Sequence, residues 1–503
     1  MSIQGVSGIS SQMISSLVDL NNQLDDLQQE LGTGKASQTY AGLGVQRGLT
    51  VGLQQQVSAL SGFDDTITAV GTQLSVAQTA LQGVATSADA VKQSAVNSKF
   101  VIDQTGQTSD QENAQGQLDQ MLGALNTQVG SNYIFSGMSP DKPSVASLTQ
   151  ILNGSGTQAG FKQVLSERQQ ADGVGAQGRL TVASPAASQV SITENAVGSP
   201  FGMKLASVTS GLTGGGTVSG PSGPPVNPNS ITVDFTGGNP APGDTVKFTF
   251  TLPDGTSQDM TLTATNSSPP AAGQFTIGAT TAQTATNFQA ALSSGVSQIA
   301  DTSLYGASAL AAGHDFFDSN PPMRVNGSPP STASTQIAGT PANTVEWYTG
   351  ENGPTPALQT ATATIDHGQT VSYGMRANEP ALTTAIKNVA IFAATTYSAT
   401  DPNASAQYDS VKSRIAGNLD GAPGTQSISD IEGQIANAQT AMTSAQTRHA
   451  QTSTVLTNFL QSIEGVNDTQ VGTQILALQT QLQASLQTTA LLSKVSIVNY
   501  ITA

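Results

Sequence analysis

Residues 428–466, ISDIEGQIANAQTAMTSAQTRHAQTSTVLTNFLQSIEGV, carry the longest periodic pattern in this chain of 503 residues. Residues along one face recur at alternating spacings of three and four, the spacing of a helix that packs against another helix. The seam positions are Ile428, Ile431, Ile435, Ala438, Met442, Ala445, His449, Thr452, Leu456, Phe459, Ile463 and Val466. A helix over this range would be roughly 55–60 Å long, at ~1.5 Å per residue.

A second seam with the same spacing lies in the N-terminal third. It consists of Ile67, Val70, Leu74, Ala77, Leu81, Val84, Ala88, Val91 and Ala95. A shorter stripe follows at Leu118, Leu122, Leu125 and Val129. We expect the segments 67–95 and 428–466 to pack together as the core of a helical bundle.

The two ends of the chain carry apolar stripes that are separated from these seams. Gly32-Thr33-Gly34 ends the first stripe, and the register slips at residues 467–470 before the last one. Chain ends are loose unless something holds them, so we expect both segments to be loosely packed in the monomer and to contact a neighbouring subunit. The predicted interface residues are Leu17, Leu20, Leu24, Leu27, Leu31, Ile475, Leu478, Leu482, Leu486, Leu492, Val495 and Val498.

The middle of the chain has a β texture, with most of the Pro residues and Gly-rich turns. Alternating apolar residues over 246–252, the turn Pro253-Asp254-Gly255 and a return strand through Leu262 predict a hairpin. Residues 231–235 predict another strand, 214–228 a linker or exposed loop, and 284–299 an amphipathic helix with Phe288, Leu292 and Val296 inward.

The predicted fold class is therefore mainly α with a β-rich insertion, in which the long helices of the two ends pair in a coiled-coil bundle. We expect five parts. They are an N-terminal axial helix and connector (1–50), the N-terminal half of the helical core (51–139), a variable β-rich outer region (140–375), the C-terminal half of the core (376–466) and a C-terminal axial helix (467–503).

The composition excludes several classes of function. Only 10% of the residues are charged, the net charge is −16, and the 17 Lys and Arg form no basic run, which argues against nucleic acid and anionic membranes as partners. No apolar run reaches the ~20 residues of a membrane helix, so no membrane insertion is expected. The chain has no Cys, which excludes disulfides and thiolate chemistry.

Catalytic or metal-binding patterns are weak. His449 lies on the long seam, where a hydrogen-bonded core or interface histidine is expected, and His367 lies in a turn. His314 with Asp315 and Asp318 could contact a metal, but one such cluster without a second histidine is poor support for a site. We predict no enzyme activity, no catalytic residues, no metal and no cofactor.

Several segments resemble the hook–filament junction proteins (hook-associated protein 3) of the flagellin superfamily. Residues 127–137, TQVGSNYIFSG, resemble the segment that closes the N-terminal core of that family, and residues 372–382, SYGMRANEPAL, resemble the return into the core. The stretch IEGVND at 463–468 and the final helix through Tyr500 resemble the family's closing helix. The resemblance covers about 1–139 and 370–503.

The resemblance implies an extracellular structural subunit of the bacterial flagellum that joins hook to filament and serves motility. It implies type III export without a cleaved signal peptide, and the first residues, MSIQGVSGISSQM, lack a basic and an apolar signal region. The implied partners are other copies in a ring, a neighbouring hook-associated protein, flagellin and an export chaperone.

Residues 32–48, GTGKASQTYAGLGVQRG, follow the first predicted helix. They differ from the segment that flagellins usually carry after that helix, which favours the junction protein over the filament subunit. Flagellin proper stays an alternative. Two others are a secreted adhesin or fibre protein that acts through the β-rich middle, and an enzyme carried by that insertion.

Overall fold

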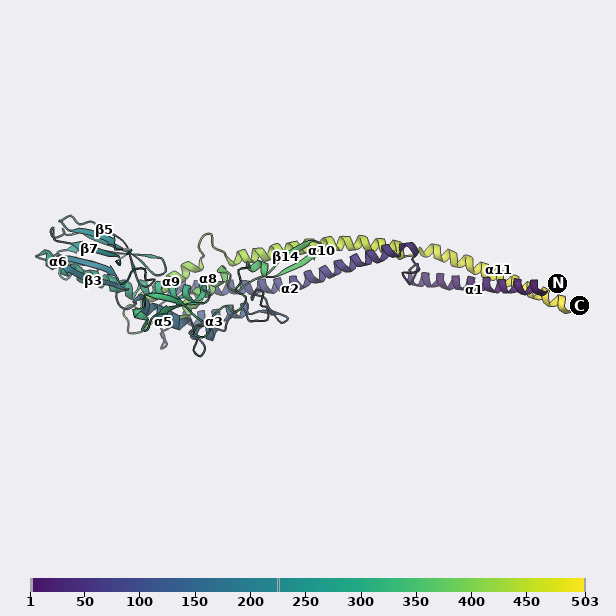
Figure 1. Cartoon of the computed structure of the whole chain (residues 1–503), viewed down its shortest axis with the longest axis horizontal. Coiled ribbons are helices and arrows are strands. Elements are labelled where there is room, and N and C mark those ends of the chain that lie inside the picture. The colour runs from purple at the N-terminus through teal and green to yellow at the C-terminus, as the bar shows by residue number, and fades with distance from the viewer. Residues whose placement is uncertain (1–2, 224, 226, 502–503) are drawn as a thin grey trace. The chain divides into compact units, whose positions relative to one another are not determined.

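The structure is a computed structural model, and it describes residues 3–223, 225 and 227–501. The chain forms two compact units (Figure 1). The first unit consists of Met1–Gly71, Ala363–Val371 and Gln439–Ala503, and the second of Thr72–Thr362 and Ser372–Ala438.

A pair of terminal helices makes up much of the first unit. Helix α1 (Ile3–Thr33) packs along helix α11 (Asp468–Ile501), and Figure 1 shows the two side by side. Helix α1 ends where Gly34 takes a left-handed φ of 66°, which glycine adopts at little cost. Asn467 caps the start of helix α11, because its side-chain oxygen accepts hydrogen bonds of 3.1 and 3.2 Å from N–H groups of the first turn.

The first unit also contains parts of two longer helices and a small hairpin. Their bounds are α2 (Arg47–Asn97), α10 (Ile428–Glu464), β13 (Thr362–Asp366) and β14 (Gln369–Ser372). Within the unit, α2 and α10 run in opposite directions. Asp64 lies 2.7 Å from His449, and Gln54 lies 3.0 Å from Glu464, which follows later on α10.

The second unit contains a cluster of shorter helices. They are α3 (Ser109–Leu125), α4 (Leu148–Asn153), α5 (Phe161–Asp172), α7 (Ser303–Gly313), α8 (Pro380–Ala394) and α9 (Ala404–Leu419). Almost every residue of α8 is buried, including the polar residues Thr383, Lys387 and Asn388, because the helix is surrounded by others. The Gln111 side chain completes a capping box at the start of α3 and donates to the Phe392 and Thr395 carbonyls at 3.0 and 2.8 Å, which fastens α3 to α8.

Two four-stranded sheets and one helix form a separate apolar core in the same unit. The strand orders are β3–β4–β7–β6 and β10–β9–β8–β5. The bounds are β3 (Leu180–Ala186), β4 (Gln189–Glu194), β5 (Lys204–Ser210), β6 (Thr217–Ser222), β7 (Ser230–Asp234), β8 (Thr245–Thr251), β9 (Ser257–Thr265) and β10 (Gln274–Thr276). Helix α6 (Thr281–Asp301) inserts Phe288 among Phe235, Phe248 and Phe275, so residues of both sheets share one core with this helix.

Short elements complete the fold. They are η1 (Gly44–Gln46), β1 (Gln128–Val129), β2 (Asn132–Tyr133), a π-helical turn η2 (His314–Asp318), β11 (Met323–Asn326), η3 (Pro330–Thr332), β12 (Thr335–Ala338) and η4 (Ala357–Thr360).

The structure confirms the fold class, mainly α with long terminal helices and a β-rich middle. All nine predicted seam positions between residues 67 and 95 are buried. The predicted hairpin is β8–β9, with Gly255 at φ 81° in its turn, and the predicted amphipathic helix is α6.

Three predictions need correction. Phe459 is 57% exposed, and the next residue, Leu460, is half-buried in its place. Residues 214–228 are not only a linker, because they contain the edge strand β6, which pairs with β7. The middle region also contains the helices α4, α5 and α7, which carry no long apolar stripe and were not predicted.

Among the other predicted seam positions of α10, Thr452 is exposed and Ser453 is half-buried beside it, whereas the large apolar residues follow the expected face. Ile431, Ile435, Met442 and Leu456 are buried, and Ile428 and Ile463 are half-buried.

Candidate assembly surface

The seam between α1 and α11 is a small apolar cluster at the end of the helix pair that adjoins the connector. Leu24, Val471 and Ile475 are buried there, with Leu27 and Leu478 packed against them. Each terminal helix therefore has a partner within the same chain, which differs from the expectation that these stripes lack one.

The predicted interface residues occupy three environments. Leu24 and Ile475 are buried and Leu17, Leu20, Leu27, Leu478 and Leu482 are half-buried, whereas Leu31 and Leu486 are exposed. Leu492, Val495 and Val498 lie outside the residues whose side chains the structure describes. Most of the described residues thus line the α1–α11 seam, and part of each remains open.

A second set of apolar residues lies away from this seam. Ile14 and Val18 on α1 and Leu476 and Leu491 on α11 are all more than half exposed. Ile14 and Val18 are four residues apart, so they share one face of α1. The sequence analysis did not include Ile14, Val18 and Leu476 because it followed a single stripe on each helix. A helix pair with apolar residues outside its own seam is a candidate surface for further helices.

The connector after α1 is tied to the boundary between α10 and α11. The Ala36 N–H donates to the Glu464 carbonyl at 2.7 Å, and the Val466 N–H donates to the Gly34 carbonyl at 3.2 Å. The Glu464 carboxylate accepts from Gln54 at 3.0 Å. Further along the connector the Val45 side chain is fully exposed. The start of the connector is thus held by hydrogen bonds, whereas this apolar side chain is not covered by any other part of its own unit.

His449 joins three elements of the first unit. Its side chain is buried, Nδ1 lies 2.7 Å from Asp64 Oδ1 on α2, and Nε2 lies 3.6 Å from Asp366 Oδ2 on β13. The Phe63 ring lies 5.9 Å from the His449 ring, centroid to centroid. The histidine expected in the core is thus a hydrogen-bonded structural residue of this joint.

Arg448 strengthens the same joint from the exposed side. Its guanidinium donates to Asp366 Oδ2 at 3.0 Å and to Gln369 Oε1 at 2.7 Å. The Arg448 hydrogen bond lowers the pKa of the Asp366 carboxyl below its usual value. These contacts hold the β13–β14 hairpin, whose turn contains His367 as expected, against α10.

The two segments at the ends of the inserted middle lie beside each other. The Ala377 N–H donates to the Phe135 carbonyl at 2.9 Å, and the Gly137 N–H donates to the Met375 carbonyl at 3.2 Å. The buried Arg376 guanidinium pairs with Glu351 and donates to a backbone carbonyl at 3.0 Å. The stretches 127–137 and 372–382, far apart in the sequence, therefore form one junction within the second unit.

No metal site is found in the part of the chain that the structure describes, since no three His, Cys, Asp or Glu side chains converge there. His314 and Asp318 are in contact, but their third neighbour is the Lys387 ammonium, 2.6 Å from Asp318. Among the described residues, no helix combines the length and apolar character needed to cross a bilayer.

Comparison with known proteins finds a family that the N-terminal helices are similar to. Residues 7–139 match the family model of the bacterial flagellin N-terminal helical region. The matched range contains most of α1, all of α2 and α3, and the junction segment 127–137. No curated protein matches the chain.

The flagellin match supports the flagellin superfamily and a structural subunit of the bacterial flagellum. That family implies self-polymerisation, flagellar partners and a place in the extracellular filament. The matched family is one of structural proteins.

Proposed function

We propose that this flagellin-type subunit is the hook–filament junction protein of the flagellum. The observation that carries the assembly part of the proposal is the set of exposed apolar side chains outside the α1–α11 seam, Ile14, Val18, Leu476 and Leu491. Side chains of this kind gain roughly 1.5–3 kcal/mol each when fully buried, so several of them can drive association with neighbouring helices. The resemblance of 127–137 and 372–382 to the junction proteins favours that member over the filament subunit.

The proposed partners are other copies in a ring, a neighbouring hook-associated protein on one side and flagellin on the other. Under this proposal, the parts 1–50 and 467–503 supply the axial helices. The parts 51–139 and 376–466 supply the helical core, and 140–375 is the outer region. Type III export and an export chaperone belong to the same proposal.

In this proposal the two terminal helices pair within one subunit, and the pair then contacts neighbouring subunits. The α1–α11 seam holds the two helices together through Leu24 and Ile475, so the subunit presents both at once. The predicted interface residues that are half-buried in that seam keep an open side for contacts with a neighbour.

Immunogold labelling of sheared flagella tests the assignment. A junction protein should be labelled in a narrow band where the hook meets the filament, with few copies per flagellum. Label along the whole filament would establish the flagellin alternative. Label on neither structure, with the protein free in the medium, would contradict both readings.

A further inference from the structure

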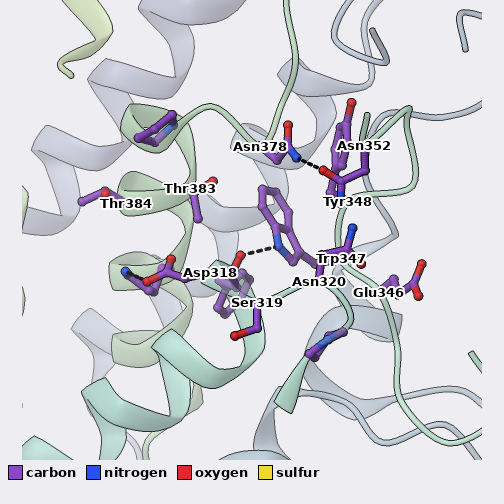
Figure 2. Close-up of a pocket in the computed structure, with 14 residues that line it drawn as sticks. Asp318, Ser319, Asn320, Glu346, Trp347, Tyr348, Asn352, Asn378, Thr383 and Thr384 are labelled. Atoms are coloured by element: carbon purple, nitrogen blue, oxygen red, sulfur yellow. Dashed lines mark hydrogen bonds and ion pairs between the residues drawn. The ribbon is translucent and has the colours of Figure 1, made fainter. Parts of the chain in front are cut away.

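The second unit contains a polar pocket at the start of helix α8. It has a volume of about 360 Å³ and lies between the first turns of α8, the segment after η2, and residues 346–352 (Figure 2). This volume is at the lower end of the ~300–1,000 Å³ range of small-molecule sites. The pocket shares no residue with the terminal helices or with the His449 joint.

One wall is aromatic. Trp347, the only Trp of the chain, is 4% exposed, and its indole N–H donates to the Phe317 carbonyl at 2.9 Å. That hydrogen bond fixes the ring, and Tyr348 beside it is anchored by a bond of 2.9 Å to the Glu351 carbonyl. Burial raises the pKa of the Tyr348 hydroxyl, so it stays neutral. Because these polar ends are occupied and the two residues are only 4% and 5% exposed, the wall contributes a narrow apolar edge to the pocket.

The opposite walls present polar groups that are free to bind. Among the described residues, the side chains of Glu346, Asn320 and Thr384 have no hydrogen-bond partner. Asn378 donates to Asn352 at 2.9 Å, as Figure 2 shows, which leaves the Asn352 amide N–H₂ and the Asn378 carbonyl oxygen available. The pocket therefore offers donors and acceptors side by side.

The charges of the pocket favour a neutral ligand. The Lys387 ammonium is 2.6 Å from Asp318 Oδ2, so the one lysine that lines the pocket is already paired. Burial opposes ionisation of Asp318, but hydrogen bonds from His314 and Lys387 outweigh it and lower the pKa of that carboxyl. The free Glu346 carboxylate remains, and it would repel a phosphate or another anion.

We propose that this pocket binds a neutral sugar residue, as a free sugar or at the end of a glycan. Vicinal hydroxyl groups both donate and accept, which matches Glu346 as an acceptor beside the Asn320 and Asn352 amides as donors. A C–H edge of the pyranose ring would lie against the small accessible part of Trp347. This binding activity is independent of the assembly role proposed above.

The single tryptophan makes the test specific, because all indole fluorescence of the full chain comes from Trp347. Neutral mono- and disaccharides are titrated to millimolar concentration, with inorganic phosphate and a primary amine as separate arms. Saturation-transfer NMR on the same samples reports binding without relying on fluorescence. Sugars should shift the emission and show saturation transfer, whereas phosphate and amine should do neither.

Glu346→Gln replaces the charged acceptor by a weaker neutral one, and Asn352→Ala removes a proposed donor. Both positions are partly exposed, so the fold should survive either substitution. Each should weaken sugar binding about tenfold, which corresponds to the loss of one hydrogen bond of ~1.4 kcal/mol. Glu112→Gln, exposed on α3 and outside the pocket, should bind as the unaltered chain does. Absence of binding by every sugar would overturn the proposal, and so would a response to phosphate or amine alone, or equal affinities in all variants.

Discussion

A matched pair of substitutions on α10 tests the corrected seam. Leu456 is 9% exposed on the face that packs within the first unit, whereas Phe459, three residues later, is 57% exposed. Replacing each by Asp introduces the same charged side chain into the same helix, so the change in helix propensity is similar. Only the burial of the two positions differs appreciably.

The expected magnitudes follow from that burial. Leu456→Asp loses the burial of a leucine, roughly 1.5–3 kcal/mol, and places an unpaired carboxylate where water is excluded. We expect a total loss of about 3–5 kcal/mol. Phe459→Asp removes a ring that is mostly in water already, and we expect a change of about 0.5 kcal/mol.

Both variants should be compared as monomers by chemical denaturation with helical circular dichroism. The chain has two compact units, so the transition of the first unit must be resolved before a free energy is assigned. The unaltered chain and Phe459→Asp should share one midpoint, and Leu456→Asp should unfold at a clearly lower denaturant concentration. Equal losses for both variants, or an unchanged midpoint for Leu456→Asp, would refute the register described above.

Three further predictions concern assembly and buried or paired charges. Deleting residues 484–503 should leave the cluster around Leu24 folded by circular dichroism but abolish incorporation into the flagellum, and normal filaments by electron microscopy would contradict this. Because the pKa of the Asp366 carboxyl is lowered in the folded chain, the carboxylate should hold the β13–β14 hairpin above about pH 4 and release it as acid protonates it below that value. Amide exchange in the hairpin, corrected for the intrinsic rate, should therefore rise on acidification. The Asp366→Asn variant should lose this pH dependence. Asp172→Ala should lower the stability of the second unit by about 1–3 kcal/mol in a denaturant titration, because it removes a buried carboxylate that accepts from Arg168 at 2.9 Å and from Ser308 at 2.6 Å, while Asp315 at 2.7 Å keeps the guanidinium paired. An unchanged midpoint would contradict this.

The seam of α2 was predictable from sequence and that of α10 only in part. An alternation of three and four averages 3.5 residues per turn, so a straight helix drifts by ~20° per heptad relative to it. Between Ile428 and Phe459 the accumulated drift approaches ~100°, which is the angle between neighbouring residues of a helix. Leu460 therefore takes the place of Phe459 on the buried face. The predicted positions of α2 stay buried despite the same drift because the buried face of this helix is wider. Ala80 and Ser87, which lie beside the predicted seam, are buried as well.

Sequence periodicity could not predict the candidate sites. The proposed sugar pocket is lined by residues from the segments 317–322, 346–352 and 378–387. The residue spacing within any one of these segments does not predict a pocket. The partners of His449 lie 385 and 83 residues away, at Asp64 and Asp366. Such contacts depend on tertiary pairing, so the sequence could predict a hydrogen-bonded histidine but not its partners.

The junction at the base of the middle region explains why binding and assembly can be separate properties of one chain. The Phe135 carbonyl accepts from the Ala377 N–H at 2.9 Å, so the chain leaves and re-enters the helical part of the second unit at one place. With the ends of the insertion fixed side by side, the length and content of the intervening segment change the closure entropy only slowly. The pocket lies between that segment, which supplies residues 317–322 and 346–352, and the first turns of α8, so its ligand can change without altering the α1–α11 seam, with which it shares no residue. For that reason pocket variants that abolish sugar binding should still assemble.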